Sequence, residues 1–368
     1  MTFDSKIAYN DLPLLPPSVD LKDQELLLAT IEASDAIAQL KTMLTMNSRT
    51  INNTMDLLSP LFVPEAVSSS GIENIITTND SVYVAKIKEE RELTPAEKEA
   101  LNYTEALMEG ATRVFTQGYL ATNDYIAIQQ ILEPTKKGIR NLPGTQLANP
   151  ITKVVYYTPP DTEKVIRDLL SNFEKYFNED APSHEVFARM AILHYQFEAI
   201  HPFPDGNGRT GRMLMPLYLT QQKRLPVPVL FMSHYILEHR DAYYEKLRAV
   251  TSKGEWKEWV LYITRATTVQ ALYTCKVLEK IRLAINTVRT TLKDDLPTVY
   301  SSELVDFLFS NVYFTQKRFE EEVGVSPMTA RKYLQELEAK DIVMKSKQTG
   351  KNRFIYINPN YTDILRQV

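Results

Sequence analysis

The chain has 368 residues, with 42 lysines and arginines against 46 aspartates and glutamates and a formal net charge of −4. At roughly 150 residues per domain this length predicts two or three domains, and an apolar content of 44% excludes wholesale disorder. The mildly acidic balance argues against a protein that coats nucleic acid or a membrane, and a count of only 11 glycines favours helices over a doubly wound α/β fold.

Cysteine content and hydropathy restrict the cellular compartment of the protein and the kinds of covalent and metal site that it can hold. The lone Cys275 rules out an intrachain disulfide and a thiolate metal cluster within one chain. No apolar run approaches the roughly 18 residues that a membrane-spanning helix needs. The N-terminus also lacks a basic segment followed by an apolar one, so a secretory signal is not expected. We therefore expect a cytoplasmic protein without membrane contact.

The elements expected in chain order are mostly helical. Residues 1–20 carry prolines without periodicity and predict an extended arm. Apolar spacing and proline positions then predict helices over 21–46, 50–61, 64–76 and 95–118, loops around a hairpin over 133–160, helices over 163–177 and 183–200, and helices from Arg209, Arg240 and Trp256, the last ending near Lys293. Residues 294–297 resemble a linker. This organisation predicts three parts: 1–100, 101–293 and 296–368.

The last part has its own pattern. Helices are expected over 301–309 and 316–323, followed by a tight turn at Gly324 and a third helix from Pro327 to Ala339. Two β-prone runs, 342–343 and 354–357, then flank a polar turn at 348–351. A helix, a turn, a helix and a β-hairpin predict a C-terminal winged helix-turn-helix domain.

Residues 201–212 read His-Pro-Phe-Pro-Asp-Gly-Asn-Gly-Arg-Thr-Gly-Arg and join two predicted helices. Glycines let the backbone approach an anion, and the free N–H groups at the start of the next helix attract phosphate. Arg209 and Arg212, at i and i+3, share a face and predict a phosphate clamp. Asp205 is placed to hold Mg²⁺, and His201 to take a proton from a hydroxyl.

Two interpretations of this string compete. The first is purely structural: a helix start with a glycine turn and solvent-facing arginines. The other is a nucleotidyl-transfer site, which is favoured because nearly every position in the string has a chemical role. The loop lacks the Lys-Ser/Thr end of a Walker phosphate-binding loop, so a standard NTPase is excluded.

The string resembles the signature of the Fic family, His-Pro-Phe-x-Asp/Glu-Gly-Asn-Gly-Arg-x-x-Arg, at every defined position. The resemblance implies a mainly α fold, in which a helical Fic core with a β-hairpin flap precedes the winged helix. It implies transfer of AMP from ATP to a Ser, Thr or Tyr hydroxyl of a protein, including self-modification, with His201 as base and Asp205 on Mg²⁺. The nucleotide contacts implied in the same way are Gly206, Asn207, Gly208, Arg209, Thr210, Gly211, Arg212, Tyr243 and Tyr244. Gly208 favours adenylylation over phosphorylation.

The resemblance extends to three further segments. The hairpin near 149–157 matches the flap that docks a target segment by strand addition, which implies docking by Val154, Val155 and Tyr156; an ordinary surface hairpin is the alternative. Tyr243 and Tyr244 match the wall of the adenine pocket, although paired tyrosines are more often core. Thr251 stands where some family members have an Asn.

Residues 69–74, Ser-Ser-Gly-Ile-Glu-Asn, resemble the Ser/Thr-x-x-x-Glu-Gly/Asn motif of an N-terminal inhibitory helix. Ser69 and Glu73 are i and i+4, so both point the same way on a helix. The resemblance implies that Glu73 pairs with Arg212 and holds ATP in a non-productive pose. A capped helix with a solvated glutamate is the alternative.

Two classes of function follow. The leading one is an autoinhibited protein adenylyltransferase that uses ATP and Mg²⁺. The other is a DNA-binding regulator whose Fic core senses nucleotide. Residues 296–368 carry 10 Lys and Arg against 9 Asp and Glu, and this net charge of +1 is small for a domain that binds DNA. Their partner, whether DNA, a target protein or a second copy in a homodimer, is left open.

Overall fold

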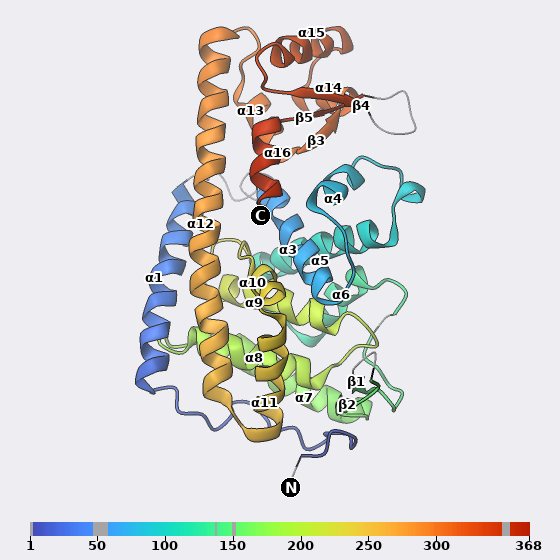
Figure 1. Ribbon diagram of the computed structural model, residues 1–368, viewed down its shortest axis with the longest axis vertical. Coiled ribbons are helices and arrows are strands. Elements are labelled where there is room, and N and C mark those ends of the chain that lie inside the picture. Colours follow the sequence, from blue (N-terminus) through green and yellow to red (C-terminus); the bar gives the residue numbers. More distant parts are fainter. Residues whose placement is uncertain (1–2, 47–57, 137, 149–151, 348–353) are drawn as a thin grey trace.

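A computed structural model of the protein describes residues 3–46, 58–136, 138–148, 152–347 and 354–368. Helices dominate these ranges, and strands are confined to two small antiparallel sheets (Figure 1). The predicted mainly α fold is therefore confirmed. Within the described ranges, no helix combines the length and the apolar character that crossing a bilayer requires.

The N-terminal part contains an extended arm, the helices α1 (Gln24–Met46), α3 (Phe62–Ile72) and α4 (Asn79–Ala85), and the short 3-10 helices η1 (Ser59–Leu61) and η2 (Glu90–Glu92). The helix expected over 50–61 falls largely outside the described residues, and its end, 59–61, is a 3-10 turn rather than an α-helix. The sequence pattern did not predict α4, which has only seven residues.

The helix α3 ends four residues earlier than the expected boundary at residue 76. Asn74 has a positive φ of 63°, and its N–H donates to Gly71 O while the N–H of Ile75 donates to Ser70 O, each at 3.0 Å. This is the hydrogen-bond pattern of a Schellman turn, in which the left-handed residue is usually Gly and sometimes Asn. Glu73 is therefore the C-cap of α3 and not an interior residue.

The central part contains the helices α5 (Pro95–Gln117), α6 (Thr122–Leu132), α7 (Glu163–Asn178), α8 (Val186–Ile200), α9 (Asn207–Gln221), α10 (Met232–Glu238), α11 (Arg240–Lys253) and α12 (Trp256–Asp295). The prediction of α5 was accurate because both of its ends carry local signals. Thr94 and Glu97 form a capping box, and Gly118 ends the helix with a φ of 80°. The pattern missed α6 and α10.

The helix α8 lies at the centre of this part and is buried almost all round, as its apolar sequence requires. It packs against α7, α9 and α12, so its C-terminal end is fixed from several sides. The chain leaves α8 at His201, turns, and enters α9. The fold therefore holds the 201–212 string between two packed helices.

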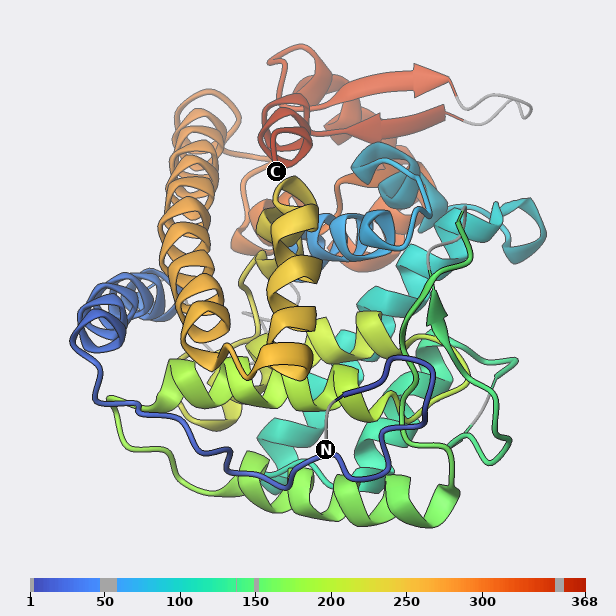
Figure 2. The same ribbon diagram turned by 60° about the horizontal axis from the view of Figure 1, so that its bottom comes forward.

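The 40-residue helix α12 runs alongside α1 and continues to the C-terminal part (Figures 1 and 2). It extends to Asp295, so the first two residues of the expected linker at 294–297 are helical. The C-terminal part contains α13 (Ser302–Ser310), β3 (Tyr313–Thr315), α14 (Gln316–Val323), α15 (Pro327–Glu338), β4 (Met344–Lys347), β5 (Phe354–Ile357) and α16 (Pro359–Arg366).

The helix, turn, helix and hairpin expected of the C-terminal part are all present as elements. Its sheet has the order β3-β5-β4, with both pairings antiparallel. The sequence pattern did not predict β3 and α16, and residues 348–353, where the polar turn was expected, lie outside the described ranges. The assignment to the winged helix-turn-helix class stays a prediction that these elements support.

Candidate functional site

The loop between α8 and α9 is shaped by two left-handed residues and one side chain. His201 ends α8 with a φ of 49°, and Gly206 precedes α9 with a φ of 79°. Inside the loop, Asn207 Oδ1 accepts from the Phe203 N–H at 2.8 Å, and Asn207 Nδ2 donates to Phe203 O at 2.7 Å. The Asn207 amide thus holds the loop closed over the buried Phe203 ring, and its main-chain N–H is what faces an anion at the first turn of α9.

A cavity of about 300 Å³ opens beside this loop. Six parts of the chain meet there: the N-terminal arm, the end of α3, the flap, the end of α8, the start of α9, and α11. The predicted site residues that line the cavity are Glu73, Tyr156, His201, Gly208, Arg212, Tyr243 and Tyr244. The structure therefore brings the predicted base, one arginine, the tyrosine pair and the glutamate predicted to inhibit to one place.

Other predicted residues lie outside the cavity lining. Thr210 and Gly211 are buried within α9, and Val154 is 63% exposed. The flap consists of β1 (Leu147–Ala148) paired with β2 (Val155–Tyr157), and its tip at 149–151 lies outside the described residues. Of the three residues predicted to dock a target, Tyr156 alone is among the residues that line the cavity.

The electrostatic setting of His201 keeps its imidazole neutral. Burial, together with the neighbouring Arg140 guanidinium, lowers the pKa of His201 to about 4. The imidazole is therefore neutral at pH 7 and able to accept a proton. Arg140 also holds the backbone of this loop in place. Its side-chain Nε donates to His201 O at 2.7 Å, and its backbone N–H donates to Pro202 O at 2.9 Å.

Arg212 is almost fully buried, at 1% exposure, and contacts both residues of the predicted inhibitory motif. Its Nε donates to Ser69 Oγ at 3.0 Å, and its Nη2 donates to Ser69 O at 3.0 Å and to Glu73 Oε1 at 2.9 Å. Burial alone would lower the pKa of Arg212, but the Glu73 carboxylate reverses this and raises the pKa above its ordinary value. The guanidinium is thus a permanent cation.

The Glu73 carboxylate also lies over the first turn of α9. A Cβ atom added at Gly208 would be 2.5 Å from Glu73 Oε1. A side chain at position 208 would therefore collide with this carboxylate, and the glycine keeps the approach open. The negative charge of Glu73 consequently occupies the space in front of the free N–H groups of α9, where an anion would bind.

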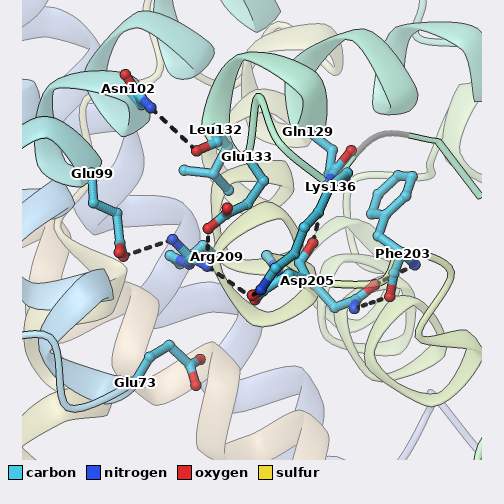
Figure 3. Close-up of polar contacts among 12 residues, drawn as sticks. Glu73, Glu99, Asn102, Gln129, Leu132, Glu133, Lys136, Phe203, Asp205 and Arg209 are labelled. Carbon is cyan, nitrogen blue, oxygen red and sulfur yellow. Dashed lines mark hydrogen bonds and ion pairs between the residues drawn. The ribbon is translucent and has the colours of Figure 1, made fainter. Parts of the chain in front are cut away.

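Arg209 lies in a neighbouring polar cluster and not in the cavity lining (Figure 3). Its guanidinium is 2.6 Å from Glu99 Oε1, 2.7 Å from Glu133 Oε1 and 3.3 Å from Asp205 Oδ1. Arg209 was predicted to clamp phosphate; in this arrangement its charge is matched by carboxylates from α5, from the end of α6 and from the loop. It fastens the start of α9 to both helices.

We predict that Arg209→Ala destabilises the protein by about 3 kcal/mol, because it leaves Glu99 and Glu133, both more than four-fifths buried, without their cation. The shift of the urea unfolding midpoint measures this loss. Arg282→Ala is the matched control, because the Arg282–Glu279 pair is exposed and its removal should cost under about 1 kcal/mol. Equal losses for the two variants would contradict the anchoring role.

Asp205, the predicted metal ligand, is partly exposed and interacts with a cation from the loop after α6. Lys136 Nζ pairs with Asp205 Oδ2, and the Gly206 N–H donates to Oδ1 at 2.7 Å. Burial alone would raise the pKa of Asp205, but these two donors hold it below its ordinary range. A single accessible, ionised carboxylate suits Mg²⁺, which keeps several waters and binds substrate phosphates in addition. The described residues offer no cluster of three or more His, Cys, Asp or Glu side chains placed for a metal.

The tyrosine pair is part of the cavity wall and part of the core at once. Tyr243 is 1% exposed, and its hydroxyl lies 2.9 Å from His194 Nε2. Burial lowers the pKa of His194 to about 3, so this histidine is a neutral, hydrogen-bonded core residue. Thr251 also lines the cavity, with its hydroxyl 2.9 Å from the hydroxyl of Tyr195.

The sequence reasoning missed two glutamates, the half-buried Glu198 and the buried Glu65. Glu198 lines the cavity one turn before His201, and burial raises its pKa to about 7. Glu65 lies in α3, accepts from the Ser233 N–H at 3.1 Å, and thereby connects α3 to α10. Its position in the first turn of a helix resembles an ordinary helix-start acid, so the sequence carried no signal for this role.

Models of protein families match the chain in three segments. Three family models match the chain: Fic/DOC family over residues 119–219, Fic/DOC family N-terminal over 27–112, and protein adenylyltransferase SoFic-like, C-terminal domain, over 284–361. The ranges 27–112 and 284–361 each cross a boundary predicted from the sequence, so the division into 1–100, 101–293 and 296–368 stays a prediction.

Curated relatives match part of the chain. Protein adenylyltransferase fic-1 of Caenorhabditis elegans is 30% identical over 164 residues, which are 43% of this chain and 30% of that protein. Protein adenylyltransferase Fic of Aedes aegypti is 28% identical over 201 residues, 53% of this chain and 39% of that protein. The chain thus spans about a third of the length of these relatives.

Solved structures share the fold at low identity. A Fic family protein from Desulfovibrio desulfuricans G20 aligns with a TM-score of 0.56 and 17% identity, covering 93% of this chain and 97% of that one. A Fic domain containing signaling protein from Bacteroides thetaiotaomicron aligns with a TM-score of 0.53 and 13% identity, covering 68% and 96%. Residues 119–219, which contain the intact string at 201–212, thus match the Fic/DOC domain, and the preceding match over 27–112 is to the N-terminal model of the same family.

Proposed function

We propose that this chain is an autoinhibited protein adenylyltransferase, which transfers AMP from ATP to a Ser, Thr or Tyr hydroxyl of a protein and modifies itself as well. The observation that carries the proposal is the meeting of a neutral His201, the Arg212 cation and the first turn of α9 in one cavity. The name protein adenylyltransferase that the relatives bear supports the same activity.

The proposed reaction divides the work among these groups. The N–H groups at the start of α9 and the Arg212 guanidinium bind the phosphates, and the tyrosine pair of α11 lines the adenine pocket. His201 takes the proton of the target hydroxyl as its oxygen attacks the α-phosphate, and pyrophosphate leaves. Asp205 would hold Mg²⁺, which would neutralise phosphate charge when bound.

Inhibition by Glu73 follows from its position in this scheme. Its carboxylate occupies the anion-binding space in front of α9 and engages the arginine proposed for the terminal phosphate. ATP then binds with its α-phosphate out of line with the incoming hydroxyl. Withdrawal of Glu73 restores the productive pose.

Alpha-labelled and gamma-labelled ATP distinguish the proposed activity from its alternatives. Incubated with the wild-type and Glu73→Gly chains, alpha-labelled ATP should label protein and gamma-labelled ATP should not, because AMP keeps only the α-phosphate. Label from the γ position would indicate phosphorylation. Label from neither, with ATP still bound, would support the second candidate, a regulator whose Fic core senses nucleotide and whose C-terminal part binds DNA.

We predict that Asp205→Ala in the Glu73→Gly chain lowers transfer by about 100-fold or more and removes its dependence on Mg²⁺, because the loop loses its metal carboxylate. Transfer measured across a Mg²⁺ titration checks this. Asp168→Ala, which removes an exposed aspartate of α7, should leave the titration unchanged. An active Asp205→Ala chain with the same Mg²⁺ requirement would place the metal elsewhere.

A cytoplasmic location, a homodimer and the partner of residues 296–368 remain predictions. DNA and a protein are both retained as partners of the C-terminal part, because its charge is close to balanced.

A further inference from the structure

The N-terminal arm, residues 3–15, passes beside the flap (Figures 1 and 2). Its contacts follow β2 and the residue after it. Ser5 Oγ donates to Val155 O at 3.0 Å, Thr158 Oγ1 donates to Ser5 O at 2.7 Å, and the Tyr9 N–H donates to Thr158 O at 3.0 Å. The arm therefore lies against the strand that the proposed function uses to dock a target, and it is bent by a turn in which the Ile7 N–H donates to Asp4 O at 3.2 Å.

The arm also delivers an aromatic side chain to the catalytic cavity. The Phe3 ring stacks on Tyr157 with centroids 6.1 Å apart and meets Tyr9 edge-on at 5.6 Å. Phe3 lines the same cavity as His201 and Tyr156. A segment that lies on the flap with one side chain at the cavity holds the place that the proposed function gives to a docked target.

The arm has a fixed base and a lightly held tip. At the base, Leu12 and Leu15 are buried, and the Asn172 amide bonds both the N–H and the carbonyl of Leu15, at 2.7 and 3.0 Å. In the tip, residues 3–10, all side chains are half-buried or exposed, and Ile7 is 65% exposed. The tip can therefore leave while the base keeps it close to the flap.

We propose that residues 3–10 occupy the target-docking surface of the flap, and that a target displaces them with a segment that bears an aromatic side chain in the place of Phe3. The proposal rests on the proposed function, because that function makes the flap a docking surface. A tethered tip acts at an effective concentration of about 1 mM, so a free segment at micromolar concentration competes poorly with it. Weakening the tip should open the surface.

A binding experiment without nucleotide tests this. A fluorescent peptide with the sequence of residues 2–11 is titrated with the full chain, either wild type or carrying Phe3→Ala and Ser5→Ala together, and its anisotropy is followed. We expect the double variant to bind the peptide at least about tenfold more tightly than the wild type does. Lys6→Ala is the matched control, because this tip side chain is exposed, and it should behave as the wild type. A peptide with alanine in place of Phe3 should bind the double variant more weakly.

Equal affinity for the wild type and the double variant would overturn the proposal. So would the lack of binding to a double variant that keeps the circular dichroism and the unfolding midpoint of the wild type. A second chain, Phe3→Asp, repeats the test with one substitution at a half-exposed position. Because no ATP is present, the result stands whether or not the chain transfers AMP.

Discussion

Replacing Glu73 by glycine is expected to raise AMP transfer, including self-modification, by about tenfold or more. The change removes the carboxylate that lies 2.9 Å from Arg212 Nη2 and in front of Gly208. The freed guanidinium then binds the terminal phosphate and brings the α-phosphate into line with the hydroxyl. Because the gain lies in the alignment and not in affinity, it should appear as faster transfer at saturating ATP.

Two companion chains sharpen this prediction. Glu73→Gln keeps the size of the side chain but removes its charge, so it should activate less than glycine does. Adding Arg212→Ala to Glu73→Gly should largely cancel the gain, since the freed arginine is what the first change supplies. Circular dichroism must show that the double variant is folded. If Glu73→Gly is no faster than the wild type on itself or on any target, the inhibitory role of Glu73 is wrong.

The second large effect is expected at His201. In the Glu73→Gly chain, His201→Ala should lower transfer by about 10² to 10⁴, the range that general-base catalysis typically contributes. Burial lowers the pKa of this imidazole to about 4, so at pH 7 the wild-type side chain is neutral and ready to accept the hydroxyl proton. Label transfer and binding of a fluorescent ATP analogue should be measured together, and binding should change only a few-fold.

The control for His201 is another histidine far from the chemistry. His184 precedes α8 and its side chain is 51% exposed, so His184→Ala should keep the transfer rate. Transfer that survives the loss of His201 would mean that another group takes the proton. Loss of ATP binding together with transfer would instead assign His201 a structural part in shaping the cavity.

Local signals explain which parts of the fold the sequence predicted well. The helix α5 has a capping box at Thr94 and Glu97 and a glycine at its end, and α8 reads as one apolar run. The 201–212 string is contiguous, so its loop and its base were recognisable before the structure. The boundary of α3 was missed because the left-handed turn at Asn74 leaves no periodic signal.

The parts that sequence reasoning missed depend on contacts between distant residues. Arg209 meets Glu99 and Glu133, which come from two other helices and lie 110 and 76 positions away, so spacing along the chain could not pair them. Arg140, which braces the backbone at His201, stands alone in a loop without a motif. Asn207 illustrates a different limit: its presence was predicted, but the direction of its amide follows from the closed loop.

The continuous helix α12 has a consequence for how a substrate reaches the cavity. At 1.5 Å per residue its 40 residues form a rod about 60 Å long, one part of which packs against α8 and another against α13. A flexible connection would let the C-terminal part move through a large volume, whereas a continuous helix fixes its position and orientation relative to α8. A macromolecule bound by the C-terminal part, as the predictions for that part have it, would therefore be presented to His201 at a set distance and angle.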